Sequence, residues 1–267
     1  MIARLIERSA TRAAAVTESV LAAAGVAPPA GLLILGHMRS GSTLLLHVLM
    51  TNPEVTSLGE RGTPYRSEAD LARLAIAARL SHGAPLRRLR YVADQINHNH
   101  LTPQEGLLAS GRLRVLFLLR KPEATIASII ELYRVYHPQP WSVAQAVDYY
   151  VERLDGLVRL GAALPRAALV SYESLTERPA DTLERLRQFL QLPRGFSTTY
   201  PTRPFTGNRG DPGRKIDAGA ILTPSATVSP AVDAAQLLAA GEAYRRCRAA
   251  LSRFALADDD VLARHDW

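Results

Sequence analysis

The chain has 267 residues, 47% hydrophobic and 21% charged, with Cys247 as its single cysteine. An apolar fraction of this size excludes an intrinsically disordered chain, and one cysteine excludes a disulfide framework. No segment approaches the roughly 18 consecutive apolar residues of a membrane span. We therefore expect a soluble, cytoplasmic globular protein with no membrane partner and one domain over residues 1–267.

The formal net charge is +7, and every basic residue except Lys121 and Lys215 is an arginine. Forked guanidinium groups match the oxygens of phosphate and sulfate, so either an anionic ligand or a compositional preference for arginine accounts for this charge. The basic residues are scattered rather than clustered, which argues against nucleic acid as a partner.

Residues 1–24 are rich in alanine and contain three arginines, a composition shared with transit peptides. Glu7 and Glu18, and the lack of a continuous apolar stretch, argue against a targeting segment. Apolar residues recur at helical spacing, which predicts an amphipathic helix over residues 1–24 that ends before Pro28.

Four short apolar runs predict buried parallel strands, at residues 32–35, 55–58, 114–119 and 167–170. Helical patterns cover residues 43–50, 67–98 with a break near 83–85, 123–133, 141–164, 181–191 with Asp181 as N-cap, and 234–254. Strands that alternate with helices at this spacing form βαβ crossovers. The prediction is an α/β fold of three layers, with a central parallel β-sheet flanked by helices.

Residues 192–230 contain six prolines and five glycines and are expected to form a long loop. Loops of this length inside a compact domain are usually functional or disordered. Arg209, Arg214 and Lys215 lie in it, so its functional interpretation is a flap that binds an anion.

The first chemical motif is the segment GHMRSGST at residues 36–43, which follows a predicted strand and opens a helix. In this context, backbone N–H groups and the helix dipole converge on an anion, as in phosphate-binding loops. Ser42 stands where the G-x-x-x-x-G-K-[ST] pattern has its lysine, and triphosphate chemistry needs that lysine. The motif therefore predicts an anion site whose cation is Arg39, with no metal; a glycine-serine turn without a ligand is the alternative.

The second motif begins where the strand at residues 114–119 ends, at Arg120. Ser128 follows about two helical turns along the next helix. An arginine at the carboxyl end of a strand and a hydroxyl on the following helix can hold a second anion, because ligands bind at that edge of open α/β sheets. An ordinary helix residue is the alternative interpretation of Ser128.

Together the two motifs resemble those of sulfotransferases that use 3′-phosphoadenosine 5′-phosphosulfate (PAPS). The 5′-phosphosulfate loop of that family, R-S-G-[ST]-[ST], is matched by Arg39, Ser40, Gly41, Ser42 and Thr43. Its 3′-phosphate motif, an arginine that ends a strand and a serine eight residues later, is matched by Arg120 and Ser128. Tyr172 begins a Tyr-Glu-x-Leu segment that lies near the adenine in the family, and Arg209 and Gly210 partly match the late R-K-G loop that closes on the 3′-phosphate.

The resemblance implies a P-loop NTPase-like sulfotransferase fold. It also implies PAPS as sulfuryl donor, 3′-phosphoadenosine 5′-phosphate (PAP) as product, and a hydroxyl or amine of a small molecule as acceptor. A P-loop kinase for a nucleotide or small molecule, and a non-catalytic nucleotide-binding relative, are the alternatives. Nothing in the sequence sets the oligomeric state. Aromatic residues could line an apolar acceptor pocket or belong to the core: Tyr65, Tyr133, Tyr136 and Trp141.

A catalytic base is expected among residues 94–101, where His98 and His100 stand two positions apart. Histidine titrates near neutral pH, which suits proton transfer. His100 resembles the catalytic histidine of the family's K-T-H-L segment, and His98 stands at the position of the lysine. Glu60, after the second predicted strand, is the rival base. Exposed loop histidines and a surface salt bridge of Glu60 are the alternatives without chemistry.

Overall fold

The computed structural model describes residues 25, 27–83, 88–164, 166–203, 215–223, 232, 234–253 and 255–257. The predicted helix over residues 1–24, and the predicted site residues Arg209 and Gly210, lie outside the described residues. No helix in the described part of the chain is both long enough and apolar enough to cross a membrane.

The strands of the described chain form one sheet in the order β2-β3-β1-β4-β5-β6, and every neighbouring pair is parallel. Their bounds are β1 (Ala30–Gly36), β2 (Val55–Ser57), β3 (Tyr91–Ile96), β4 (Leu113–Leu119), β5 (Ala167–Ser171) and β6 (Ala255–Ala257). The predicted parallel α/β fold is therefore confirmed, and all carboxyl ends of the strands meet at one edge of the sheet.

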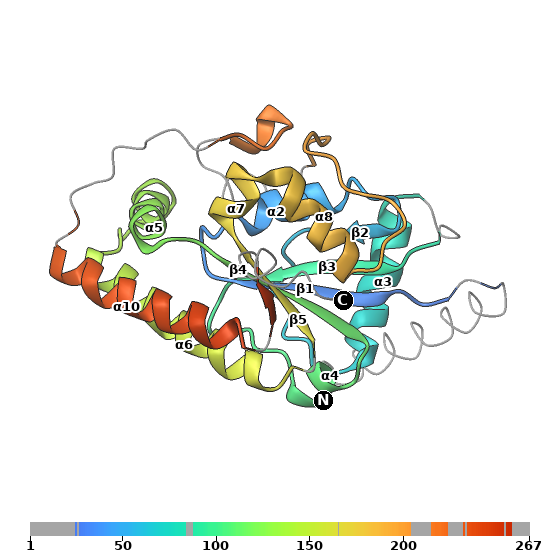
Figure 1. The fold of residues 1–267 in the computed structure, drawn as a ribbon, viewed down its shortest axis with the longest axis horizontal. Helices are drawn as coiled ribbons and strands as arrows, with labels where there is room; N and C mark the ends of the chain where they lie inside the picture. The colour runs from blue at the N-terminus through green and yellow to red at the C-terminus, as the bar shows by residue number, and fades with distance from the viewer. Residues whose placement is uncertain are drawn as a thin grey trace, which may run out of the picture.

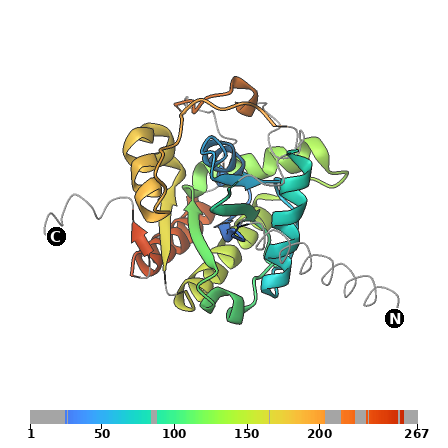
Figure 2. The ribbon, with the colours of Figure 1, turned by 90° about the vertical axis from the view of Figure 1, so that its right-hand side faces the viewer.

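Helices cover both faces of this sheet, which makes the three layers (Figure 1). The helices are α2 (Ser42–Leu49), α3 (Glu68–Ser81), α4 (Glu105–Ala109), α5 (Pro122–Tyr136), α6 (Val143–Ala162), α7 (Tyr172–Glu177), α8 (Pro179–Phe189) and α10 (Ala234–Leu251), and η1 (Lys215–Ala218) is a short 3₁₀ helix. Side chains of α2, α7 and α8 share one core, and those of α3, α4, α5, α6 and α10 share the other. Figure 2 shows α8 in gold and α3 in cyan at opposite sides of the molecule.

The central strand β1 is apolar along its whole length because both of its faces are covered. Leu33 and Leu35 point into the core beneath α5 and α6, whereas Leu32 and Ile34 point into the core beneath α2. All four side chains are completely buried. At about 1.5–3 kcal/mol for each buried leucine or isoleucine, this strand is anchored strongly enough to fix the loop that follows it.

The prediction of helix over residues 67–98 is wrong in its second half. Helix α3 ends at Ser81, and residues 91–96 form β3, which pairs with β1 from Ala30↔Tyr91 to Leu35↔Ile96. Asp94 and Gln95 interrupt the apolar run of this strand, yet both are buried. Asp94 accepts the hydroxyl of Tyr65, and Nε2 of Gln95 donates to Glu60, so these two polar side chains find partners far away in the sequence. The local pattern of β3 therefore does not resemble a buried strand.

Two smaller expectations also change. Helix α8 begins at Pro179 with Arg178 as its N-cap, so Asp181 is not the cap but lies in the first turn, where a negative charge favours the helix dipole. The segment predicted as a long loop contains η1 and an isolated antiparallel bridge between Thr199 and Ala220. Its described part is therefore tied down rather than irregular throughout.

Candidate functional site

The loop between β1 and α2 has the backbone shape that an anion site needs. Arg39 and Gly41 both adopt left-handed conformations, with φ of 64° and 94°, and the Ser40 N–H donates to the carbonyl of His37 at 3.1 Å. A Cβ atom at Gly41 would lie 2.4 Å from Cδ2 of Tyr172, so only glycine fits there. The first turn of α2 has no side-chain cap, so N–H groups at this helix start can serve a ligand.

The two predicted anion motifs form one cluster. Nε of Arg39 donates to Oγ of Ser128 at 2.8 Å, so the phosphate loop reaches directly to α5. Nη1 of Arg120 donates to the carbonyl of Arg39 at 3.1 Å. The Arg120 guanidinium carbon also lies 4.2 Å from the centre of the Tyr172 ring, the geometry of a cation–π contact. Motifs that are far apart in the sequence thus bring two arginines, a serine and an aromatic ring together.

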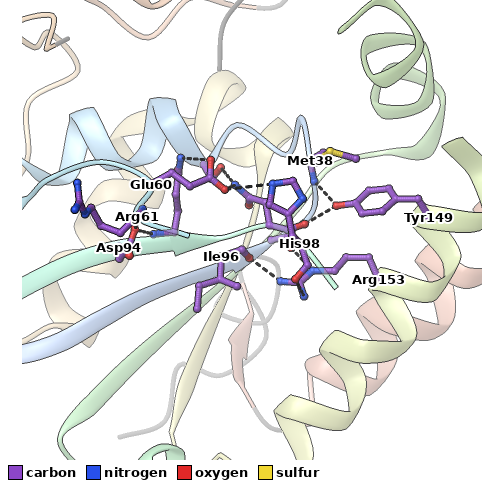
Figure 3. A network of polar contacts seen from close by, with 12 residues as sticks. Met38, Glu60, Arg61, Asp94, Ile96, His98, Tyr149 and Arg153 are labelled. Carbon is purple, nitrogen blue, oxygen red and sulfur yellow. Dashed lines mark hydrogen bonds and ion pairs between the residues drawn. The ribbon is translucent and has the colours of Figure 1, made fainter. Parts of the chain in front are cut away.

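Glu60 lies beside the same loop through amide side chains at the end of β3. Nδ2 of Asn97 donates to Oγ of Ser42 at 3.1 Å and to Oε1 of Glu60 at 3.4 Å. Nε2 of Gln95 donates to Oε2 of Glu60 at 3.2 Å. Nε2 of His98 lies 3.8 Å from Oε1 of Glu60 (Figure 3). Glu60 is therefore connected to the phosphate loop by a single intervening side chain.

The two predicted histidines differ in their surroundings. His98 is partly buried beside Glu60, whereas His100 is exposed, and the two rings stack with centroids 5.6 Å apart. Burial lowers the pKa of His98, and electrostatic interactions with His100 and Arg153 lower it further. Burial raises the pKa of Glu60, against its hydrogen bonds from Asn97 and Gln95. His98 lies next to Glu60, which Asn97 connects to the phosphate loop, whereas His100 stacks on the ring of His98.

Residues outside the two sequence motifs also support the site. Nε2 of His37 accepts the backbone N–H of Arg120 at 3.1 Å, while Nδ1 donates to the Met38 carbonyl at 2.9 Å. This arrangement requires the neutral ring, and burial lowers the pKa of His37 to about 3. From α6, Tyr149, Tyr150 and Arg153 contact backbone groups at the ends of β1, β3 and β4. Their helical spacing, one turn on a single face, was the only local signal for them.

The aromatic residues considered as acceptor contacts divide into two groups. Tyr65 is buried, and its hydroxyl donates to Oδ2 of Asp94 at 2.5 Å, so it belongs to the interior. Tyr133 and Trp141 stack with ring centroids 4.0 Å apart and are only partly buried. Tyr136 is exposed at the end of α5.

Two buried polar atoms at this edge of the sheet test whether the residues fit a nucleotide with two anionic groups. Among the described residues, neither Oγ of Ser40 nor Nε of Arg120 has a hydrogen-bond partner. A buried donor without a partner costs about 1–3 kcal/mol, which a ligand oxygen can recover. One orphaned donor lies in each of the two anion motifs, so the residue set fits such a ligand.

Comparison with known proteins adds structural likeness only. No family model matches the chain, and no curated protein matches it. A sulfotransferase domain from the curacin biosynthetic pathway is similar with a TM-score of 0.47 and 14% identity, over 81% of this chain and 98% of that domain. Mouse sulfotransferase SULT7A1 complexed with PAP is similar with a TM-score of 0.39 and 14% identity, over 62% of this chain and 60% of that one. The chain is structurally similar to sulfotransferases at low sequence identity.

Proposed function

We propose that the protein transfers the sulfuryl group of PAPS to a hydroxyl or amine of a small molecule. The observation that carries the proposal is the contact of Arg39 with Ser128, together with that of Arg120 with the Arg39 carbonyl. These contacts join a phosphate loop that lacks lysine to a second cationic site. Two adjacent anion sites suit a nucleotide with separate 5′ and 3′ anions better than a linear triphosphate.

The residues divide by the part of the donor that they would hold. Arg39, with Ser40, Gly41, Ser42 and Thr43, would bind the 5′-phosphosulfate, and Arg120 and Ser128 would bind the 3′-phosphate. Tyr172, which packs on Gly41 and under Arg120, would face the adenine. PAPS supplies a sulfuryl group bound to a phosphate leaving group. Its transfer depends mainly on alignment and on neutralisation of charge on the leaving oxygen, a role that suits the permanent charge of Arg39.

Glu60 is the base that the contacts favour. It must accept a proton from the acceptor, and burial raises its pKa toward the range in which a carboxylate works as a base near neutral pH. Its link to Ser42 through Asn97 keeps it beside the phosphate loop. His100, selected for its resemblance to the family's histidine, and His98, 3.8 Å from Glu60, are the competing bases.

The first test is thermal stabilisation of the purified protein by PAP, by AMP, and by ATP with Mg²⁺. A ligand at 100 times its Kd adds about 2.7 kcal/mol of stability, a clear shift in melting temperature. The proposal expects a shift with PAP, which Arg39→Ala and Arg120→Ala both lose. Arg134→Ala is the matched control, because Arg134 is exposed and pairs with Glu131 on its own helix.

The second test measures product directly, with radiolabelled PAPS and a panel of alcohols, phenols and amines. Sulfated product that disappears in both site variants supports the proposal. A shift with Mg²⁺-ATP in place of PAP would favour a P-loop kinase. Binding of PAP without product from any acceptor would favour a non-catalytic nucleotide-binding protein.

A further inference from the structure

Helix α6 contacts the backbone where strands β1 and β3 stop pairing. The ladder between β1 and β3 ends at Leu35↔Ile96. Beyond this point the chains diverge into the phosphate loop and into the segment that carries His98. Backbone groups at such a point need new partners, because buried N–H and C=O groups are almost always hydrogen-bonded. Side chains of α6 supply them (Figure 3).

Arg153 satisfies three of these carbonyl groups at once. Its side chain is among the largest that are completely buried, with 2% of the residue exposed. Nε donates to the carbonyl of Gly36 at 2.7 Å, Nη2 to that of Ile96 at 2.6 Å, and Nη1 to that of His98 at 3.1 Å. A planar guanidinium offers donors in fixed directions, so these bonds set the separation between the end of β1 and the end of β3.

Tyr149 makes a second bridge between the same two segments. Its hydroxyl accepts the N–H of Met38 at 2.7 Å and donates to the carbonyl of Asn97 at 2.5 Å. Met38 precedes Arg39 in the phosphate loop, and Asn97 is the residue whose side chain connects Ser42 with Glu60. The Tyr149 hydroxyl therefore joins the phosphate loop to Asn97, the residue that contacts the candidate base Glu60.

Burying a guanidinium costs desolvation, which its three carbonyl acceptors offset. An apolar side chain of similar volume would leave these carbonyl groups without a donor, so Arg153 both stabilises the strand ends and fixes their separation. Its charge also disfavours positive charge on His37 and His98, whose pKa values are lowered by burial first and by Arg153 as a further cause. The fixed donor directions of this one guanidinium hold the ends of β1 and β3 at a defined separation.

We propose that Tyr149 and Arg153 are positioning residues that align the phosphate loop with the Glu60–Asn97 side of the site. The inference rests on the proposed sulfuryl transfer and adds two residues to its machinery. Neither residue is placed against donor or acceptor; each acts through the backbone of residues 36–38 and 96–98. In-line transfer tolerates little misalignment, since a displacement of about 1 Å can cost about 100-fold in rate.

Tyr149→Phe is the most informative variant because it removes only the hydroxyl. Tyr91→Phe is its matched control: Tyr91 is buried at the opposite end of β3, and its hydroxyl donates to the Leu190 carbonyl at 2.9 Å. Both variants should lose unfolding free energy in denaturant titrations, and Tyr149→Phe should lose more because it removes two hydrogen bonds rather than one. We expect Tyr149→Phe to lower kcat about 10-fold or more with the acceptor that reacts fastest, while Tyr91→Phe leaves kcat unchanged. The Kd for PAP should move much less than kcat, because Arg39, Ser128 and Arg120 keep their contacts.

Arg153→Lys separates geometry from charge. Lysine keeps the buried positive charge but not the planar fork, so we expect kcat to fall as in Tyr149→Phe. Unchanged kcat in both variants would overturn the inference, and so would a loss of PAP affinity as large as the loss of kcat. A wild-type protein that neither binds PAP nor forms product would instead overturn the proposed function, and the positioning role with it. An active wild type with fully active Tyr149→Phe and Arg153→Lys variants overturns the positioning role alone.

Discussion

Arg39 is the residue on which both halves of the candidate site depend. Its Nε contacts Ser128 on α5, its carbonyl accepts from Arg120, and its backbone takes the uncommon left-handed conformation. A non-glycine residue held at positive φ is uncommon and persists where the surrounding structure fixes it. The strain therefore orients this one guanidinium toward α5 rather than toward solvent.

Arg39→Lys tests whether the fork, and not only the charge, is needed. Lysine is a point charge on a flexible stem and cannot reproduce the directed contact with Ser128 while it neutralises a ligand oxygen. We expect kcat to fall about 100-fold, the usual cost of losing one group that stabilises developing charge. The measurement is the initial rate with radiolabelled PAPS, and Arg134→Lys is the control. Wild-type kcat in Arg39→Lys would contradict the assignment.

The raised pKa of Glu60 predicts how the reaction rate depends on pH. A carboxylate must be ionised to accept a proton, and burial raises the pKa of Glu60 above its ordinary value. The rate should therefore be low at acid pH and rise as the pH passes through the raised pKa, so that this limb lies above the pH at which an exposed glutamate titrates.

Glu60→Gln should abolish that limb and reduce kcat by about 100-fold or more. The measurement is the profile of kcat/KM between acid and neutral pH. His100→Ala and His98→Ala are compared with it under the same conditions. A profile that survives in Glu60→Gln but disappears in His100→Ala would transfer the role of base to His100.

At the scale of elements, the sequence predicts those strands and loops whose residues show a local pattern. Strands β1, β4 and β5 each contain a continuous apolar run, and the loop after β1 is bounded by glycines at positions 36 and 41. β3 was missed because Asp94 and Gln95 are polar, and their partners Tyr65 and Glu60 come from another part of the chain. Only the folded arrangement lets a strand with two polar residues lie buried between β2 and β1.

Gly41 gives a prediction at the same scale, since it joins the loop, α2 and α7. Gly41→Ala would force a Cβ atom to 2.4 Å from the Tyr172 ring at a φ of 94°, whereas Gly111→Ala has a φ of 71° and no atom within 4 Å of its Cβ. Both variants should lose about 1–2 kcal/mol of unfolding free energy from the left-handed backbone.

Only Gly41→Ala should also displace Tyr172 and weaken PAP binding. Denaturant titration measures the stability of both variants, and calorimetric titration with PAP measures their affinity. Equal affinity for PAP in Gly41→Ala and the wild type would show that the packing of Tyr172 on the loop has no part in binding.

At the scale of the whole molecule, the site is a meeting of three strand ends that no local pattern reveals. Sequence motifs identified Arg39, Arg120, Ser128 and Tyr172, each within a recognisable context. The α6 residues Tyr149 and Arg153 are not predicted, because their partners are backbone groups at the ends of β1 and β3 and in the segments that follow them. Bonds to the backbone carry no residue-type signal at the partner, so sequence alone cannot pair them.

Asp94 links this arrangement to the stability of the whole chain. It is completely buried on β3, where it accepts the Tyr65 hydroxyl and the N–H groups of Arg61 and Gln95. Burial raises the pKa of Asp94 to about 7, and the nearby negative charge of Glu60 adds to this rise. In the unfolded chain the pKa of an aspartate is about 3.9.

The sign of the effect follows from proton counting. Between about pH 4 and pH 7 the unfolded chain has released this proton while the folded chain keeps it, so a rise in pH favours unfolding. The stability associated with Asp94 is complete below about pH 4, falls by up to about 4 kcal/mol by pH 7, and changes no further above that.

Asp94→Asn does not titrate and should show none of this loss. Titrating groups that do not interact with Asp94 affect both proteins equally, so the measurement is the difference between their unfolding free energies in denaturant at each pH. Parallel curves from pH 4 to 7 would mean that Asp94 stays ionised in the folded protein, held so by the donors of Tyr65, Arg61 and Gln95.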